Sequence, residues 1–221
     1  MTKKRFSRFW FQCISSIFAT IILLCAAGTQ LTADEGPNKE EASNATAVHV
    51  VDRLHEALIE AMKMGDKSSC QERFQLLAPV IQKSFDFETI SRIVLGRRHW
   101  RSLDERTRDK FVKAFAQMTV ATYAQRFKDY SGEKFETAEA KLDPRGYCFV
   151  KAFLIKKDGE KIDFEYVCKK VNGEWKIVSV SARGVNDLSL KRADYNNFLK
   201  KHTVEDLIKL LEAQAGRCLN Q

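Results

Sequence analysis

The sequence has little proline, glycine or histidine, and these shortages narrow the class of protein. Three Pro and ten Gly in 221 residues exclude a collagen-like chain and a long flexible linker. With 44% hydrophobic and 30% charged residues, the chain can bury a core and is not disordered throughout. The length is sufficient for one domain with at most a small satellite.

Recognisable catalytic and metal-binding patterns are also missing. Four scattered histidines and six cysteines without a CxxC pair provide no zinc-ligand pattern. There is no GxSxG, HExxH, P-loop or GxGxxG. Asp163 and Glu165 are acids on a predicted hairpin, but strand alternation points them away from its apolar side. We therefore expect no metal and no cofactor, and an enzyme is the less favoured class.

Positive charge is concentrated at the N-terminus. The formal net charge is +8, but residues 1–33 hold four basic residues and no acid. Removing them leaves 33 basic against 29 acidic residues, a net charge of +4. This mild excess does not predict a nucleic-acid-binding protein.

The same N-terminal residues have the order of a secretory signal peptide. A basic start precedes an apolar stretch from Ile14 to Gly28 and small residues suited to cleavage. The alternatives are a retained anchor over residues 9–27 and a lipoprotein at Cys25, which lacks a small residue before it. We predict a signal peptide over 1–33, a flexible segment over 34–46 and one domain over 47–221.

The mature chain reads as helices, then strands, then helices. Apolar residues at helical spacing are followed by period-two alternation broken by turn residues, which predicts an α+β fold with helices on one face of an antiparallel sheet. Pro79 is expected to kink or divide the second helix, and Ser102 to Glu105 to form a capping box for the longest one. The predicted helices cover 47–64, 69–81, 86–96, 102–130, 189–200 and 203 onward, and the predicted strands cover 134–142, 147–156, 161–170 and 175–182.

Four cysteines remain after the predicted cleavage. Pairing the apolar sides of the two central strands places Cys148 opposite Cys168. A cross-strand disulfide is then possible, and Cys70 and Cys218 would form the second pair. The alternative for Cys148 and Cys168 is two buried thiols.

A dense basic and aromatic cluster runs over residues 97–101, with the sequence RRHWR. It has the composition of a site for phosphate or for an acidic partner surface. The alternative is a solvated loop that Trp100 anchors to the core.

Three sequence blocks, taken in order, resemble the MlaC (toluene-tolerance) family. The first runs from Phe85 through Gly96 to Trp100, and the second covers residues 119–124 and 130–133. The third has Gly184 and Val185, with Arg192 eight residues after the glycine. The sequence of residues 184–195 is more similar to the hopanoid-associated HpnM branch. Ser179 occupies a position where the family often has an acidic residue.

The resemblance implies a periplasmic lipid-binding protein of Gram-negative bacteria with a curved, nuclear-transport-factor-like sheet. Such proteins hold acyl chains inside and carry lipid between an inner-membrane ATP-binding-cassette (ABC) transporter complex and an outer-membrane lipoprotein complex. For the HpnM branch, the implied cargo is a hopanoid or a related polycyclic lipid.

We therefore predict a lipid carrier without catalytic activity. The alternatives are an enzyme, which would need a buried, hydrogen-bonded acid or histidine at the cavity floor, and an interaction module, which would have a filled core. Helical and strand periodicity cannot separate a core from a pocket wall. The predicted lipid-lining residues are Phe115, Met118, Val150, Leu154, Phe164, Tyr166, Val178 and Val180.

Overall fold

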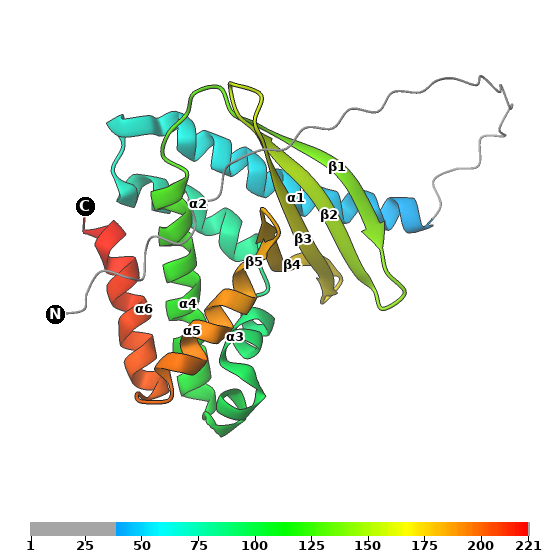
Figure 1. Ribbon diagram of the computed structural model, residues 1–221. Helices are drawn as coiled ribbons and strands as arrows, with labels where there is room; N and C mark the ends of the chain where they lie inside the picture. The colour runs from blue at the N-terminus through cyan, green and yellow to red at the C-terminus, as the bar shows by residue number, and fades with distance from the viewer. Residues whose placement is uncertain (1–38, 221) are drawn as a thin grey trace, which may run out of the picture. The chain divides into compact units, whose positions relative to one another are not determined.

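The computed structural model describes residues 39–220 as helices packed against one five-stranded antiparallel sheet (Figure 1). The predicted α+β class is confirmed. The predicted signal peptide lies outside the described residues. None of the described helices has the length and apolar character needed to span a bilayer. The helices are α1 (Lys39–Met64), η1 (Gly65–Lys67), α2 (Cys70–Ser84), α3 (Phe87–Ser102), α4 (Glu105–Arg126), α5 (Asp187–Phe198) and α6 (Val204–Leu219).

The sheet is a meander in which each strand pairs with the next, in the order β1-β2-β3-β4-β5. The sequence predicts its four long strands to within one or two residues, because alternation and turn residues mark both ends. The short fifth strand leads directly into α5. The strands are β1 (Lys134–Leu142), β2 (Tyr147–Ile155), β3 (Lys161–Val171), β4 (Glu174–Ala182) and β5 (Val185–Asn186).

Helix α1 begins earlier than the sequence pattern predicts. It starts at Lys39, which corrects the expectation of a flexible segment for residues 39–46. That segment lacks apolar periodicity but is rich in Ala, Glu and Lys, which have high helix propensity. Four apolar residues at helical spacing in this helix are all buried, and α1 packs against β1, β2 and β4. They are Val51, Leu54, Leu58 and Met62.

Two predicted helix boundaries need correction. Helix α2 continues through Pro79 to Ser84 and is not divided. Helix α4 is capped by Asp104, whose side chain accepts a hydrogen bond from the Thr107 backbone N–H at 2.7 Å. The predicted capping box at Ser102 is therefore wrong, since aspartate three residues before Thr107 supplies the cap by itself.

The starts of α3 and α6 agree with the predicted helix ranges. Asp86 caps α3 by accepting from the Thr89 backbone N–H at 3.0 Å. Thr203 and Asp206 form the reciprocal capping box of α6. Helix α3 has non-helical backbone angles at Gly96, where the sequence predicts its end, and a short helical segment follows this break.

The sheet buries one face. Alternating residues of β2 and β3 point inward toward the helices, and Cys148 lies opposite Cys168 as predicted. The other face carries Lys151 opposite Glu165 and Phe153 opposite Asp163. A one-sided sheet of this kind places every inward side chain of the strands against α1 or the helical layer.

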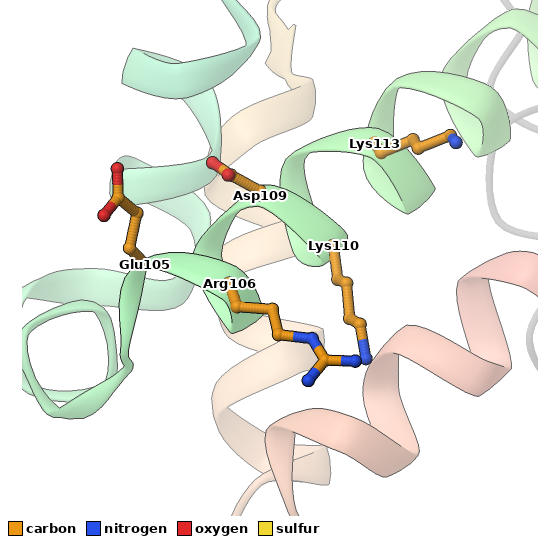
Figure 2. Close-up of a pocket in the computed structure, with 5 residues that line it drawn as sticks. All are labelled: Glu105, Arg106, Asp109, Lys110 and Lys113. Carbon is orange, nitrogen blue, oxygen red and sulfur yellow. The ribbon is translucent and has the colours of Figure 1, made fainter.

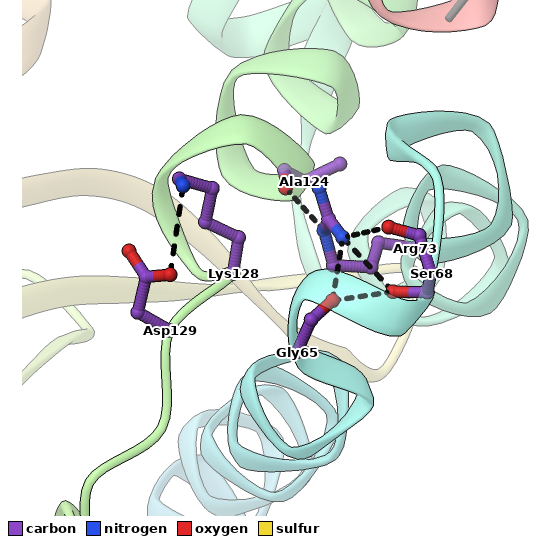
Figure 3. Close-up of polar contacts among 6 residues, drawn as sticks. All are labelled: Gly65, Ser68, Arg73, Ala124, Lys128 and Asp129. Carbon is purple, nitrogen blue, oxygen red and sulfur yellow. Dashed lines mark hydrogen bonds and ion pairs between the residues drawn. The ribbon is translucent and has the colours of Figure 1, made fainter.

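Arg73 connects three parts of the helical layer although it is almost fully buried (Figure 3). Its Nε donates to the Ala124 carbonyl at 2.9 Å, near the C-terminal end of α4. Its Nη1 donates to the carbonyl and hydroxyl oxygens of Ser68 at 2.7 and 2.9 Å, and to the Gly65 carbonyl at 3.3 Å. The guanidinium thus satisfies carbonyl groups that the helix ends leave without partners.

Of the two predicted disulfides, the structure contains one. Cys70 in α2 and Cys218 in α6 form a disulfide, with their Cα atoms 5.1 Å apart. Cys148 and Cys168 are buried thiols, so the predicted cross-strand bond is absent. Directly opposite residues of an antiparallel pair have Cβ atoms about 4.5–5.5 Å apart, and a disulfide needs about 3.5–4.5 Å, so the strand register alone does not bring two sulfur atoms within bonding distance. Burial raises the pKa of both thiols, which keeps them protonated.

Candidate functional site: an aromatic row between α4 and the sheet

Aromatic side chains from α3, α4, β1 and β3, and from the residues that end α2 and α4, form a continuous row through the protein, which we call the aromatic row. Each ring centroid lies 5.7–6.4 Å from the next, within the range of favourable ring contacts. The row therefore joins α4 and α3 to the inner face of the sheet. In order, it consists of Phe115, Phe87, Phe85, Tyr123, Phe127, Phe135, Phe164 and Tyr166.

The ends and the middle of the aromatic row differ in exposure. Phe115 and Tyr166 keep 2% and 1% of their accessible surface, whereas Tyr123, Phe127, Phe135 and Phe164 are half-buried. Burial raises the pKa of the Tyr123 phenol, so this ring is recessed among protein atoms although part of it remains accessible. The middle of the row thus offers apolar ring surface that residues 39–220 leave partly accessible.

The eight predicted lining residues occupy three kinds of position. Phe115, Met118, Val150 and Tyr166 belong to the tightly packed core, and Phe164 and Val180 are half-buried and pack against it. Leu154 and Val178 are buried but lie outside this core cluster. The structure therefore brings six of the eight together, with only Phe164 and Val180 retaining substantial accessible surface.

Val178 does not follow the alternation that the sequence suggests. The β3–β4 register shifts so that Tyr166 lies opposite Val180 and Cys168 opposite Ile177. Val178 is the extra residue of this irregularity, so Ile177 takes the inward position. A bulge inserts one extra residue into a strand. Where neighbouring residues are apolar, as in the IVSV of residues 177–180, the sequence does not show which of them is the extra one.

The sequence places His55 near the apolar stripe of its helix, which favours a structural histidine, but it does not identify the partners of the imidazole. The Nε2 atom of this buried α1 residue lies 2.9 Å from the Tyr166 hydroxyl, and the imidazole stacks on Phe135 with centroids 4.0 Å apart. Its place on the helical stripe with Val51 and Leu58 is the signal that indicates burial. Its partners come from strands 80 or more positions away, and no local pattern identifies them.

The His55–Tyr166 pair has the burial and hydrogen bond that the enzyme hypothesis requires, but its acid–base properties suit a structural role. Burial lowers the pKa of His55 to about 3, and burial raises the pKa of Tyr166. Both groups are neutral near pH 7, where a base with a pKa of about 3 is a poor proton acceptor. The pair connects α1 to β3 beside the aromatic row.

An open pocket of about 430 Å³ lies elsewhere, on the first turns of α4. In Figure 2, Arg106 and Lys110 point to one side of the helix and Glu105 and Asp109 to the other, with Lys113 further along. This charged surface includes none of the predicted lining residues and does not suit an acyl chain. Within residues 39–220, no group of three or more His, Cys, Asp or Glu side chains is placed to hold a metal ion.

Comparison with known proteins gives a consistent result. One curated relative, the intermembrane phospholipid transport system binding protein MlaC of Haemophilus influenzae, is 25% identical over 128 residues. The match covers 56% of this chain and 59% of that protein, so the chain spans about three fifths of its relative.

A solved structure has the same fold. It is the phospholipid-binding protein of Ralstonia solanacearum in complex with a phospholipid, with a TM-score of 0.66 and 18% identity, covering 81% of this chain and 99% of that one. At this identity the likeness establishes the fold. The family model described as MlaC protein matches residues 52–213, most of the chain. This protein therefore belongs to the MlaC protein family.

Proposed function

We propose that this protein is a phospholipid carrier that holds acyl chains against the middle of the aromatic row. The observation that carries the proposal is that four consecutive rings of the aromatic row, Tyr123, Phe127, Phe135 and Phe164, are half-buried and pack against the core. Membership of the MlaC family and the names of its two relatives support phospholipid as the ligand.

The mechanism is passive and needs no catalytic group. Burying a methylene stabilises the complex by about 0.8 kcal/mol, so an acyl chain of about sixteen carbons supplies on the order of 10 kcal/mol. Such burial is slow to reverse in water. Release therefore requires a receiving partner or membrane to separate the helices from the sheet.

The compartment and partners follow from the same proposal. A cleaved leader over residues 1–33 would deliver the protein to the periplasm, and the Cys70–Cys218 disulfide supports an oxidising compartment. There it would carry lipid between two membrane complexes. These are the inner-membrane ABC transporter complex and the outer-membrane lipoprotein complex. The curved sheet would then serve as the nuclear-transport-factor-like wall of the site.

The HpnM-like sequence of residues 184–195 bears on which lipid the protein carries. If the chain belongs to that branch, a hopanoid or related polycyclic lipid replaces or joins phospholipid as the cargo. The aromatic row can contact either ligand, because flat rings and extended chains both bury apolar area against it.

Native mass spectrometry of the protein purified from its own cells tests the proposal. We expect one bound lipid, and extraction under denaturing conditions then distinguishes phospholipid from hopanoid by mass. Absence of lipid, together with failure to take up lipid from vesicles, would refute the carrier function.

A matched pair of substitutions localises the site. Phe164 and Phe153 are half-buried phenylalanines on neighbouring strands that point to opposite faces of the sheet. We expect Phe164→Gln to lower lipid occupancy several-fold and Phe153→Gln to leave it unchanged, with circular dichroism as the check on folding. Equal losses in both variants would place the lipid elsewhere.

A further inference from the structure

Three exposed arginines lie close together in the last part of α3. Arg97, Arg98 and Arg101 are all exposed, and no acid occurs between Gly96 and Leu103. None of the three forms an ion pair with any residue in the described range 39–220. Their charges are therefore not neutralised by the part of the protein that the structure describes.

A fourth arginine reaches the same place from a distant part of the chain. Gly96 has φ 74° and ψ 159°, which interrupts α3. The Arg192 guanidinium of α5 lies 3.6 Å from the position that a Cβ atom at Gly96 would occupy. Arg192 is exposed and likewise has no carboxylate partner among the described residues. We call Arg97, Arg98, Arg101 and Arg192 the arginine corner.

The backbone that carries the arginine corner is held in place. Trp100 is 9% exposed and packs into the core. The Arg108 Nε donates to the Trp100 carbonyl at 3.1 Å, and its guanidinium lies 5.5 Å from the centre of the indole ring. Asp104, the nearest acid that follows, is used as the cap of α4. The α3 backbone that carries three of the four arginines is therefore held in place by packing and hydrogen bonds.

The chemistry of the corner favours one class of partner. A protein interface usually has an exposed apolar centre, and the exposed large hydrophobic residues of the described chain are Tyr130, Val185 and Leu190. None of them is in the α3 segment, and Leu190 lies two residues before Arg192 on α5, so the helical turn places it about 200° away from that arginine. Long, unpaired cations without an apolar centre instead suit a continuous layer of phosphate groups.

We propose that the arginine corner docks this protein on the surface of an anionic phospholipid bilayer. The proposal rests on the carrier function, because a carrier must approach a membrane to load or release lipid. It adds the surface of approach and the charge of the membrane. Each arginine contributes about a fivefold increase in affinity, and the sum decreases with salt because screening shortens the range of attraction.

Vesicle sedimentation tests the proposal with the protein as its own cells produce it. We expect binding to vesicles of phosphatidylcholine and phosphatidylglycerol at low salt, little binding to pure phosphatidylcholine, and release at 0.5 M salt. The triple variant Arg97→Gln, Arg98→Gln, Arg101→Gln should bind about a hundredfold more weakly. The control removes the same charge at exposed sheet and hairpin lysines, as Lys134→Gln, Lys141→Gln, Lys157→Gln.

Each outcome decides the proposal. Loss of binding in the arginine variant alone supports it. Equal loss in both variants would show a general charge effect, and absence of binding to anionic vesicles would leave an acidic protein as the partner of the corner; either result overturns the proposal. Native mass spectrometry of the arginine variant should still show bound lipid. Vesicle binding without any bound lipid would instead indicate failure of the carrier function alone.

Discussion

His55 and Arg73 are buried basic side chains that the protein accommodates in different ways. His55 stays neutral between Phe135 and Tyr166, whereas Arg73 keeps its charge and donates to backbone oxygens at the ends of neighbouring elements. Burial of a basic group costs free energy unless it loses its proton or finds acceptors, and these two residues show both solutions.

Neutral His55 should make the protein sensitive to mild acid. Its pKa is about 3 in the folded state and 6.5 when exposed, so below pH 6.5 only the unfolded chain binds the proton. Stability should therefore fall as the pH drops from 6.5 toward 3. Between pH 7 and 4.5, urea unfolding should show about 2–3 kcal/mol more loss for the natural protein than for His55→Gln.

Glutamine can bond to the Tyr166 hydroxyl but does not titrate, and the carboxylates that titrate at lower pH are shared by both proteins. Identical pH dependence of the two would contradict the buried, neutral state of His55.

Removing Arg73 should be costly because several oxygens lose their donor at once. We expect Arg73→Met to lower the free energy of unfolding by about 3 kcal/mol, measured by urea titration. Arg92 is an exposed arginine whose side chain makes a 3.4 Å contact with Thr89, and Arg92→Met should change stability by no more than about 0.5 kcal/mol. A small effect at Arg73 would mean that water replaces its hydrogen bonds.

Among the elements, α3 has the least regular backbone. Its first part is capped by Asp86 and carries buried Ile90, Val94 and Leu95, and its second part follows the break at Gly96. The break allows Arg192 of α5 to lie against the backbone, which places two of the three family-like sequence blocks in contact. A continuous helix would have moved residues 97–101 to a different surface.

Two glycines allow a test of this break. Gly96 has a positive φ with an extended ψ of 159°, a combination that is essentially restricted to glycine, so Gly96→Ala should destabilise the protein by about 1–3 kcal/mol. Gly216 lies inside α6, and the nearest atom to a Cβ there is 3.8 Å away. Gly216→Ala should stabilise the protein by up to about 1 kcal/mol, as thermal unfolding can show. Equal signs for both variants would contradict this account of α3.

At the scale of the whole molecule, one set of contacts connects the helices to one another and a second set connects the helices to the sheet. Cys70–Cys218 connects α2 to α6, and Arg73 connects α2 to α4 and the turn after α1. The sheet meets α1 through the His55–Tyr166 bond and through a 2.7 Å hydrogen bond from Thr137 to Asp52. We expect lipid entry to separate the sheet from the helices and to leave the helical layer intact.

Reducing the Cys70–Cys218 disulfide tests how much this bond contributes to stability. The same experiment tests whether Cys148 and Cys168 are thiols. The bond closes a loop of 148 residues, so a reductant should lower the free energy of unfolding by about 4–5 kcal/mol. The variant Cys70→Ala, Cys218→Ala should have this lower stability from the start and should not respond to reductant. A further response in guanidinium titration would show that Cys148 and Cys168 form a disulfide after all.

The sequence alone predicts the local features of this protein. Period-two alternation sets the ends of the strands and the residues that face inward, and Cys148 opposite Cys168 follows from it. Helical spacing and capping residues locate the helices, with errors at Lys39 and Asp104 where propensity or a single cap decides the boundary. These features depend on residues a few positions apart, so a linear pattern contains them.

Only the tertiary structure decides which apolar faces meet and which polar groups they enclose. His55 and Tyr166 are 111 positions apart, Arg73 and Ala124 are 51 apart, and Arg192 meets Gly96 from another helix. The bulge at Val178 and the half-buried middle of the aromatic row likewise arise from packing between elements. Periodicity shows that a side is apolar, but the same side forms a filled core or a ligand surface according to how closely the opposite element approaches it.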